Sequence, residues 1–181
     1  MKTYLEIKVP IKYDDPWFKE LRSLFADIPV RWQKDFYHIT MAFVNDTPKG
    51  IDLCPILEGH LADVVAPVLT FDQLDIFSTG SGMYIFHLSA SQVPEDFLAL
   101  TESIRADMKA AGCLIQSDFM LHVTLGRLRD FNIRLPKLKR MIKSLPLPPF
   151  TLTLADVDYR EFRGSTIYET QLPKTENLIK K

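Results

Sequence analysis

The chain has 181 residues, 46% of them hydrophobic, and a formal net charge of −1. This length fits one domain or two small fused halves, and the apolar content excludes a disordered chain. The near-zero charge excludes binding to nucleic acid or anionic membranes through the overall charge, and it leaves room only for a local basic patch.

Cysteine content and hydropathy indicate the cellular location that we expect for the protein. The two cysteines, Cys54 and Cys113, form no CxxC motif, so we expect two reduced thiols. The residues after Met1 lack the apolar stretch of a signal peptide. No apolar run approaches the roughly 18 residues that a membrane span requires. We therefore expect a cytoplasmic protein without a membrane segment.

Hydrophobic periodicity predicts a series of elements that occurs twice along the chain. The first series is a strand at 3–9, a helix at 16–28, an extended segment at 31–44, a helix from about 52 to 65 and a strand at 70–77. The second is a strand at 83–90, a helix at 94–111, an extended segment at 114–128, a helix at 135–145 and a strand at 150–159, followed by an extra strand at 165–172.

This repeat predicts one bilobal domain over residues 1–181, with halves of about 1–82 and 83–173 and a polar tail at 174–181. Two such halves, related by a pseudo-two-fold axis, give an α+β fold. We expect two antiparallel sheets to face a central cleft, with the helices on the outside.

Each extended segment carries a motif of histidine, apolar residue, threonine and apolar residue. The first is His38-Ile39-Thr40-Met41 and the second is His122-Val123-Thr124-Leu125. Because strand side chains alternate between faces, the histidine and threonine of each motif share one face and the apolar residues take the other. We expect the pseudo-two-fold axis to bring both polar pairs into one cleft.

A lone His-x-Thr segment is usually an ordinary surface alternation. Here two of the four histidines have a threonine two residues later, which chance produces in roughly one sequence in a thousand. The equivalent positions of the two motifs in a repeat favour a functional role further. The other histidines, His60 and His87, have no threonine at that position, and we expect them to be structural or surface residues.

On these motifs the sequence resembles the two-histidine phosphoesterases, which include the RNA 2′,3′-cyclic phosphodiesterases also called 2′-5′ RNA ligases. The resemblance covers nearly the whole chain. The second motif fits most fully, as His-Val-Thr-Leu-Gly-Arg over 122–127, and Gly164-Ser165-Thr166-Ile167-Tyr168 is similar to the closing strands of the family. The resemblance implies a bilobal α+β fold with a water-filled cleft, and an enzyme that hydrolyses 2′,3′-cyclic phosphate ends of RNA or 2′-5′ linkages.

The predicted cleft suits this reaction on chemical grounds. Hydrolysis of a cyclic phosphate needs a base that activates water and an acid that protonates the leaving oxygen, and two histidines provide both without a metal or other cofactor. The hydroxyls of Thr40 and Thr124 are candidates to donate to the non-bridging oxygens. The resemblance suggests His122 as base and His38 as acid, but the pseudo-symmetric residues themselves leave this assignment open.

Arg127 is a further candidate, because the arginine of the family's second motif resembles a phosphate contact and guanidinium suits that bidentate role. Strict alternation places Arg127 on the face opposite His122. A phosphate role therefore requires a bulge or the end of the strand at Gly126. A structural salt bridge is the alternative.

The residues that flank the motifs divide by the same alternation. Phe36 and Met120 fall on the cleft face and are candidates for contact with a base or ribose, whereas Tyr37 and Phe119 fall on the core face. From 127 to 143 the chain holds seven basic residues (127, 129, 134, 137, 139, 140 and 143) and one acid, Asp130. This segment either contacts RNA phosphates or forms a solvated helix face.

Two other functions stay open. In a metallohydrolase, His38 and His122 would be metal ligands, although the sequence lacks the nearby acidic residues and the HxxxH spacing of such sites. In a binding module, the cleft would hold an RNA end or a small phosphate without turnover. In every case the expected partner is RNA or a nucleotide, and nothing in the sequence indicates an obligate protein partner.

Overall fold

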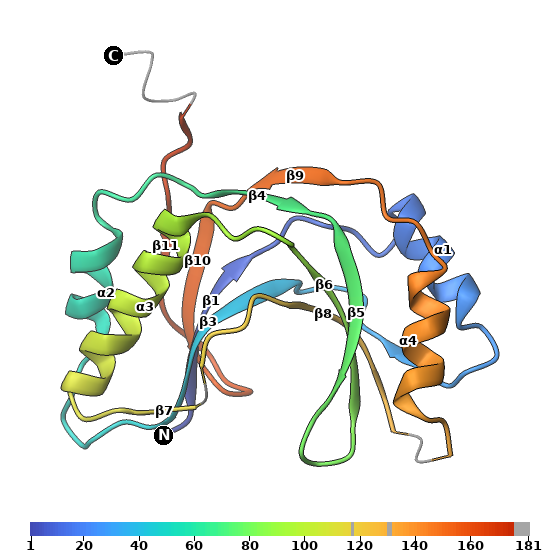
Figure 1. Cartoon of the computed structure of the whole chain (residues 1–181). Coiled ribbons are helices and arrows are strands. Elements are labelled where there is room, and N and C mark those ends of the chain that lie inside the picture. The colour runs from blue at the N-terminus through green and yellow to red at the C-terminus, as the bar shows by residue number, and fades with distance from the viewer. Residues whose placement is uncertain (117, 130–131, 176–181) are drawn as a thin grey trace.

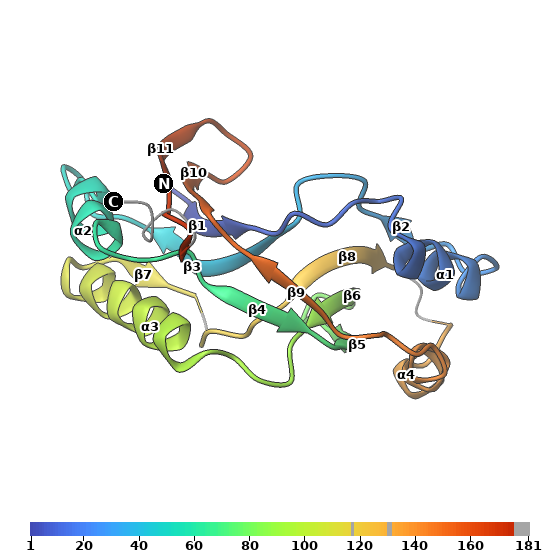
Figure 2. The same ribbon diagram turned by 90° about the horizontal axis from the view of Figure 1, so that it is seen from above.

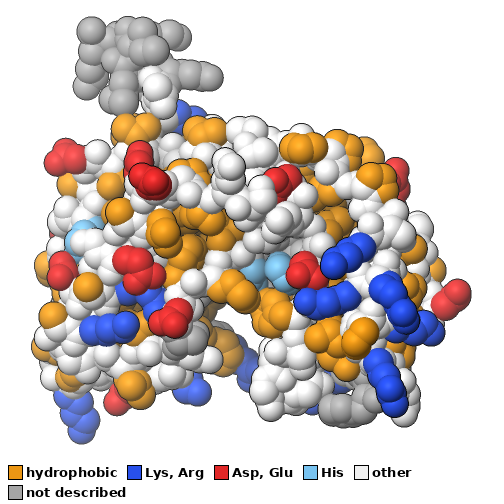
Figure 3. All heavy atoms as spheres, viewed as in Figure 1, with side chains coloured by type: hydrophobic (Ala, Val, Ile, Leu, Met, Phe, Trp, Pro, Cys, Tyr) orange, Lys and Arg blue, Asp and Glu red, His pale blue; other side chains and the backbone are white. Residues whose placement is uncertain are grey.

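The computed structural model describes residues 1–116, 118–129 and 132–175. Its two lobes lie side by side (Figure 1), and the space-filling view shows a notch between them (Figure 3). Asp130 of the basic segment and residues 176–181 of the predicted tail lie outside the described residues. The helices are α1 (Pro16–Leu24), α2 (Cys54–Leu61), α3 (Glu95–Ala110) and α4 (Leu135–Lys143). The strands are β1 (Thr3–Lys8), β2 (Arg31–Trp32), β3 (His38–Asp46), β4 (Val68–Phe71), β5 (Gln73–Ser78), β6 (Tyr84–Ser89), β7 (Leu114–Ile115), β8 (Val123–Leu128), β9 (Phe150–Thr153), β10 (Asp156–Glu161) and β11 (Thr166–Gln171). The α+β class is confirmed.

The helices form where the sequence periodicity places an apolar stripe. Three of them, α1, α2 and α4, carry a proline in the first two positions, where a missing N–H costs no helical hydrogen bond. Phe18 and Leu21 of α1 are buried, as are Leu138 and Ile142 of α4. Most of the helical stability therefore comes from burial of one face against the sheet.

One antiparallel sheet runs through both lobes in the order β11-β10-β1-β3-β8-β6-β5. The motif strands β3 and β8 are neighbours at its middle, joined where Ile39 faces Val123. Strand β2 pairs with β8, and β7 pairs with β3. The sequence predicts two sheets that face each other. The structure instead joins these half-sheets edge to edge, because the two motif strands pair directly.

A separate ribbon of β4 and β9 crosses over the top of the molecule, on the side away from the notch (Figures 1 and 2). Together with the β3–β8 junction, this ribbon links the two lobes. The lobes are therefore connected at two levels, above the cleft by the ribbon and at its floor by the motif strands.

The strand pairing has an approximate two-fold symmetry. Exchanging β1 with β6, β3 with β8 and β10 with β5 leaves the order of these strands unchanged, and the same operation exchanges β2 with β7 and β4 with β9. The helices follow the same rule, because α2 contacts α3 in one lobe and α1 contacts α4 in the other (Figure 1). Each lobe thus contains elements from both ends of the chain. The division into halves at about residue 82 stays a prediction.

Four predicted extended segments are each divided into two strands. The segment at 31–44 becomes β2 and β3, and that at 114–128 becomes β7 and β8, because each short strand pairs with one motif strand before the chain crosses to the opposite lobe. The first crossing contains Phe36 at a φ of 56°, a left-handed backbone that a strand does not accommodate. The segments at 70–77 and 150–159 divide where the chain leaves the β4–β9 ribbon for the main sheet.

The apolar residues of both motifs lie in the hydrophobic core, as the alternation predicts. Ile39, Val123 and Leu125 are fully buried, and Met41 is 1% exposed. Their opposite face is therefore the one that meets the space between the lobes. Among the residues that the structure describes, no helix is long and apolar enough to cross a membrane.

Candidate active site

The two motifs meet at the junction of the lobes. The antiparallel register of β3 with β8, continued by one residue in each direction, places His38 opposite Thr124 and Thr40 opposite His122. All four side chains consequently share one face of the sheet. Thr40, His122 and Thr124 line a cavity of about 570 Å³. Histidine side chains are visible at the head of the notch in Figure 3. The structure thus brings together the four predicted catalytic residues.

The backbone orients both histidines in the same way. Nδ1 of His38 lies 2.9 Å from the carbonyl oxygen of Phe36, and Nδ1 of His122 lies 2.9 Å from that of Met120. Because a carbonyl oxygen only accepts hydrogen bonds, each Nδ1 carries a proton, and each neutral ring keeps its lone pair on Nε2. Nε2 is therefore the atom of each ring that can take a proton from a substrate or return one.

Burial in the cleft lowers the pKa of both histidines, because desolvation disfavours the charged ring. The carbonyl acceptors of Phe36 and Met120 oppose this shift, and the positive charge of Arg127 adds to it in both rings. A charge on His38 also lowers the pKa of His122. The two histidines therefore titrate as a coupled pair in which one protonated and one neutral ring is favoured over two charged rings.

A β-bulge turns Arg127 into the cleft. The register between β6 and β8 shifts between Thr124 and Gly126, which leaves one residue of β8 unpaired and moves Arg127 to the face of Thr124. Both residues line the cavity. A Cβ at position 126 would lie 2.7 Å from the ring of Trp32, so this position requires glycine. Nη1 of Arg127 donates to Oε1 of Gln33 at 3.4 Å, and Arg127 forms no salt bridge with any residue that the structure describes. The bulge that a phosphate role requires is present.

The residues that flank the motifs are distributed between the cleft face and the core face differently from the prediction. Met120 is 48% exposed and lines the cavity, whereas Phe36 is 74% exposed and lines a neighbouring groove. Tyr37 is buried, in agreement with the alternation. Phe119 is half-buried: it packs against the core, with its ring centre 6.1 Å from that of Phe97, and it also lines the cavity. Residues 118–121 lie outside β8 and outside its extension by one residue to His122, so the alternation does not apply to them.

A buried carboxylate lies beside His38 and is absent from the predicted site. The sequence pattern marks Glu6 only as one polar residue of an alternating strand. In the structure Glu6 faces Thr40 across the β1–β3 pair and is 4% exposed. Its Oε2 lies 3.2 Å from Nδ1 of His38, and its Oε1 lies 3.8 Å from Nη1 of Arg160. Burial raises the pKa of Glu6 to about 7.

His87 lies next to the second motif, as a buried residue that does not line the cavity. It faces Thr124 across the β6–β8 pair and is 8% exposed. Its ring centre lies 6.1 Å from that of His122, nearly perpendicular to it, and the ring of Phe77 contacts both. Nδ1 of His87 has no hydrogen-bond partner within the described part of the chain. Burial and the neighbouring His122 lower the pKa of His87 to about 4.

The fourth histidine lies outside this cluster. Nε2 of His60 is 2.8 Å from Oδ2 of Asp107, in a pair that links α2 to α3, as a structural histidine would be. Over residues 1–116, 118–129 and 132–175, no group of three or more His, Cys, Asp and Glu side chains is arranged to hold a metal ion. The histidines that converge at the junction of the lobes are therefore His38, His87 and His122.

Comparison with known proteins agrees with this geometry. Residues 88–168, which include the second motif and Arg127, match the family model described as LigT like Phosphoesterase. The structure of E. coli LigT complexed with 3′-AMP has a TM-score of 0.64 and 18% identity, over 94% of this chain and 97% of that chain. Kluyveromyces marxianus Usb1 has a TM-score of 0.64 and 10% identity, over 94% of this chain and 98% of that chain. A second Usb1 structure contains uridine monophosphate.

The family model and the solved structures cover different parts of this likeness. Residues 88–168 are similar to the LigT-like phosphoesterases, and the chain as a whole has the fold of E. coli LigT and Usb1. No curated protein matches the sequence. At 18% identity or less, the solved superfamily structures show the shared fold, while the family model covers the second motif and not the first. The first motif is related to the second through the two-fold symmetry of β3 and β8.

Proposed function

We propose that this protein is a metal-independent phosphoesterase that hydrolyses 2′,3′-cyclic phosphate ends of RNA, or 2′-5′ linkages, with His38 and His122 as general acid and base. The observation that carries the proposal is the common orientation of the two rings. Both donate through Nδ1 to the backbone, which leaves both Nε2 atoms for the substrate. Two threonine hydroxyls accompany them on the same face of the sheet, at the positions opposite the histidines.

In this reaction a water oxygen attacks the phosphorus while the P–O3′ bond breaks. Nε2 of neutral His122 takes the proton from the water, and Nε2 of protonated His38 gives its proton to the leaving O3′. The product carries a 2′-phosphate and a free 3′-hydroxyl. Exchange with solvent then removes the proton from His122 and restores that of His38. Thr40 and Thr124 donate to the non-bridging oxygens, where negative charge is concentrated in the transition state.

The lining of the cavity supports a nucleotide substrate. Its volume of about 570 Å³ lies in the range of small-molecule sites. Arg127 supplies a cation at the phosphate end, and Phe43, Phe77 and Phe162 add aromatic surface for a base or ribose. The superfamily structures with 3′-AMP and uridine monophosphate support the same class of ligand.

The test is turnover of 2′,3′-cyclic nucleotides and of oligonucleotides with a cyclic phosphate end. We expect His38→Ala and His122→Ala each to lower kcat/KM by roughly a hundredfold or more. His60→Ala is the matched control, because it removes a histidine that pairs with Asp107 outside the cleft. Equal turnover by the wild type and both cleft variants would contradict the acid–base roles.

The same assay decides between the competing functions. Treatment with EDTA should leave the activity unchanged, whereas its loss and recovery on adding back a divalent cation would favour a metallohydrolase. Micromolar binding of the cyclic-phosphate oligonucleotide without turnover would favour a binding module. A ligase acts in the reverse direction at the same site, so it predicts that an RNA with a 2′,3′-cyclic phosphate end is joined when a 5′-hydroxyl partner is in excess. The 5′-oxygen would attack the phosphorus while the P–O3′ bond breaks, which leaves a 2′-5′ linkage and a free 3′-hydroxyl.

A further inference from the structure

We propose that Glu6 and His87 are positioning residues that make the two symmetric histidines unequal, with Glu6 holding His38 as the proton donor and His87 leaving His122 as the proton acceptor. The inference deepens the proposed function, and its catalytic part rests on that function. Its physical part, an unequal proton affinity of the two rings, stands on the contacts of the folded protein alone.

The two residues occupy equivalent positions in the fold. Glu6 faces Thr40 of the first motif, and His87 faces Thr124 of the second. The register shifts next to both residues, between Leu5 and Glu6 in one lobe and between Phe86 and His87 in the other. The two-fold operation that exchanges β1 with β6 therefore also exchanges Glu6 with His87. An acidic residue stands on one side of the cleft where an imidazole stands on the other.

Glu6 acts on His38 through its charge. Nδ1 of His38 already donates to the carbonyl of Phe36, so the carboxylate 3.2 Å away is an ionic neighbour of that nitrogen. Both side chains are shielded, with 29% of the His38 side chain and 5% of the Glu6 side chain exposed. An anion at this distance in a poorly hydrated site favours the protonated ring.

The charges around this pair come from three strands. Arg160 and Asp158 of β10 and Lys8 of β1 act on Glu6, and Arg160 favours its ionised form. Lys8 is itself paired with Asp158 at 2.9 Å. Arg127 of β8 and Arg160 disfavour a charge on His38. Burial raises the pKa of Glu6 to about 7, and above that pH its carboxylate is the anion that lies 3.2 Å from Nδ1 of His38.

Among the residues that the structure describes, none places such an anion beside the second histidine. The described charged groups that act on the pKa of His122 are His38 and Arg127, and both disfavour its protonation. His87 is uncharged near neutral pH, since its pKa is about 4, with Asp75 raising and Lys139 lowering it. Its ring and that of Phe77 enclose the side of His122. His122 is therefore held neutral, as a general base must be.

The first test follows each histidine by NMR during a pH titration of the full chain without substrate. We expect His38 to have a higher apparent pKa than His122. Glu6→Gln keeps the shape and removes the charge, and it should lower the titration midpoint of His38 by about one unit or more while that of His122 stays in place. Glu20→Gln, at an exposed position of α1, is the control. An unchanged midpoint of His38, or an equal shift of both rings, would overturn the inference.

The second test measures kcat/KM against pH with a 2′,3′-cyclic nucleotide. The alkaline limb reports loss of the donor proton, so Glu6→Gln should move that limb to lower pH, and Glu6→Asp should restore part of the shift. His87→Glu places an anion beside His122 and should move the acidic limb to higher pH, whereas His87→Gln should not move that limb. A shift of the acidic limb in Glu6→Gln would reverse the assigned roles.

The two experiments distinguish a failure of this inference from a failure of the proposed function. If the wild type fails to turn over any cyclic nucleotide, the proposed function is wrong, and the NMR titration still decides whether Glu6 makes the two rings unequal. If His87→Glu does not fold, which near-UV circular dichroism shows, Glu6→Gln and Glu6→Asp carry the test by themselves. A structural role of Glu6 would lower stability and kcat without moving either limb.

Discussion

Gly126 lies at the β-bulge that turns Arg127 into the cleft, at a position with no room for a side chain. A Cβ at this position would lie 2.7 Å from the ring of Trp32 and 2.9 Å from Val30. We therefore expect Gly126→Ala to lower the free energy of unfolding by about 1–3 kcal/mol through overpacking. It should also raise KM for cyclic nucleotides, because β8 must move to relieve the contact and Arg127 moves with it.

Chemical denaturation and steady-state kinetics check this prediction, with Gly59→Ala as the matched control. Gly59 lies inside α2 with no atom within 4 Å of a Cβ. Alanine there should stabilise the protein by roughly 0.5–1 kcal/mol and leave KM unchanged. Equal effects of the two substitutions would show that the bulge does not position Arg127.

His87 makes the protein sensitive to acid. Its pKa is about 4 in the folded state and near 6.5 in an unfolded chain. Between these values the unfolded chain binds a proton that the folded protein does not, so stability falls as the pH drops from about 6.5 to about 4. The contribution lost is roughly 3 kcal/mol.

His87→Gln removes this titration. In urea denaturation series at several pH values, the wild type should therefore lose up to roughly 3 kcal/mol relative to the variant as the pH falls through this window. The difference between the two proteins should be constant above pH 7. A difference that does not change with pH would mean that His87 is as easily protonated in the folded protein as in the unfolded chain.

The sequence predicts the motif residues as the candidate site but gives no indication of Glu6 and His87 beside them, and the reason is physical. The His-x-Thr spacing reports which side chains share a face of one strand, and this is local geometry. The positions of Glu6 and His87 next to the motifs come from strand order, since both belong to strands that flank the motif strands. A sequence pattern contains no information on which strand lies next to which, so a lone glutamate in β1 carried no signal.

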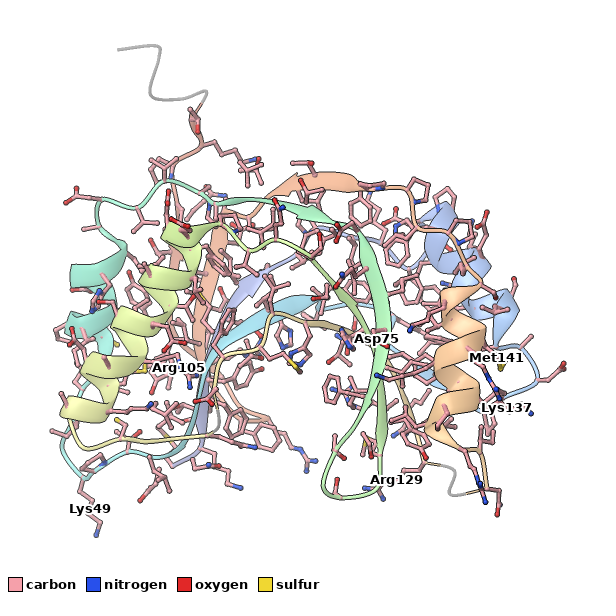
Figure 4. All side chains as sticks on the ribbon, in the orientation of Figure 1. Lys49, Asp75, Arg105, Arg129, Lys137 and Met141 are labelled. Atoms are coloured by element: carbon pink, nitrogen blue, oxygen red, sulfur yellow. The ribbon has the colours of Figure 1, made fainter. Side chains whose placement is uncertain are left out.

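At the level of secondary-structure elements, α4 presents a basic face beside the active site. Leu138 and Ile142 are buried, and Lys139 pairs with Asp75 of β5 at 3.6 Å. Lysine and arginine side chains gather over this lobe in Figure 3, and Figure 4 shows Lys137 on α4 and Arg129 beyond β8 on the same side. The exposed basic residues of the segment are Arg127, Arg129, Arg134, Lys137, Arg140 and Lys143.

We predict that this face contacts the phosphates of an RNA chain whose end lies in the cleft. Replacement of Lys137, Arg140 and Lys143 by Gln should raise KM for an oligonucleotide with a cyclic phosphate end about tenfold, and leave KM for a cyclic mononucleotide unchanged. Loss of three phosphate contacts should also reduce the slope of log KM against log salt by about 2.

The matched control replaces Lys49 and Lys109, two exposed residues of the other lobe. An equal change for the two substrates, or no change for either, would identify the basic face of α4 as an ordinary solvated surface. The two interpretations that the sequence leaves open for this segment are thereby separated by one pair of substrates.

Element boundaries show a similar limit of local patterns. The helices and the apolar side of each strand follow from periodicity, and their positions agree with the structure to within a few residues. The division of four extended segments does not, because it depends on where a chain leaves one strand partner for another. Phe36, with its left-handed backbone, marks one such crossing, and nothing in the type of this residue indicates it.

Over the whole molecule, the lobes are built by exchange between the two halves of the chain. Strand β5, from the first half, completes the sheet of β6 and β8, and β10, from the second half, completes the sheet of β1 and β3. Neither half can therefore form a lobe by itself, although the sequence repeat suggests that it would. The active site also needs both halves, since each contributes one His-x-Thr motif.

We therefore predict that the fragments 1–82 and 83–181 are each unfolded alone and fold when mixed. The cut falls in the β5–β6 turn, where Gly80 and Ser81 are exposed and few hydrogen bonds are lost. Alone, each fragment leaves apolar strand residues such as Ile76 and Phe86, which are fully buried in the intact chain, without their partner strand. The mixture should regain near-UV circular dichroism, cooperative unfolding and turnover of cyclic nucleotides, each dependent on fragment concentration. Cooperative unfolding of 1–82 alone would show instead that a half-chain forms its own core, and that the exchange of strands follows folding of the halves.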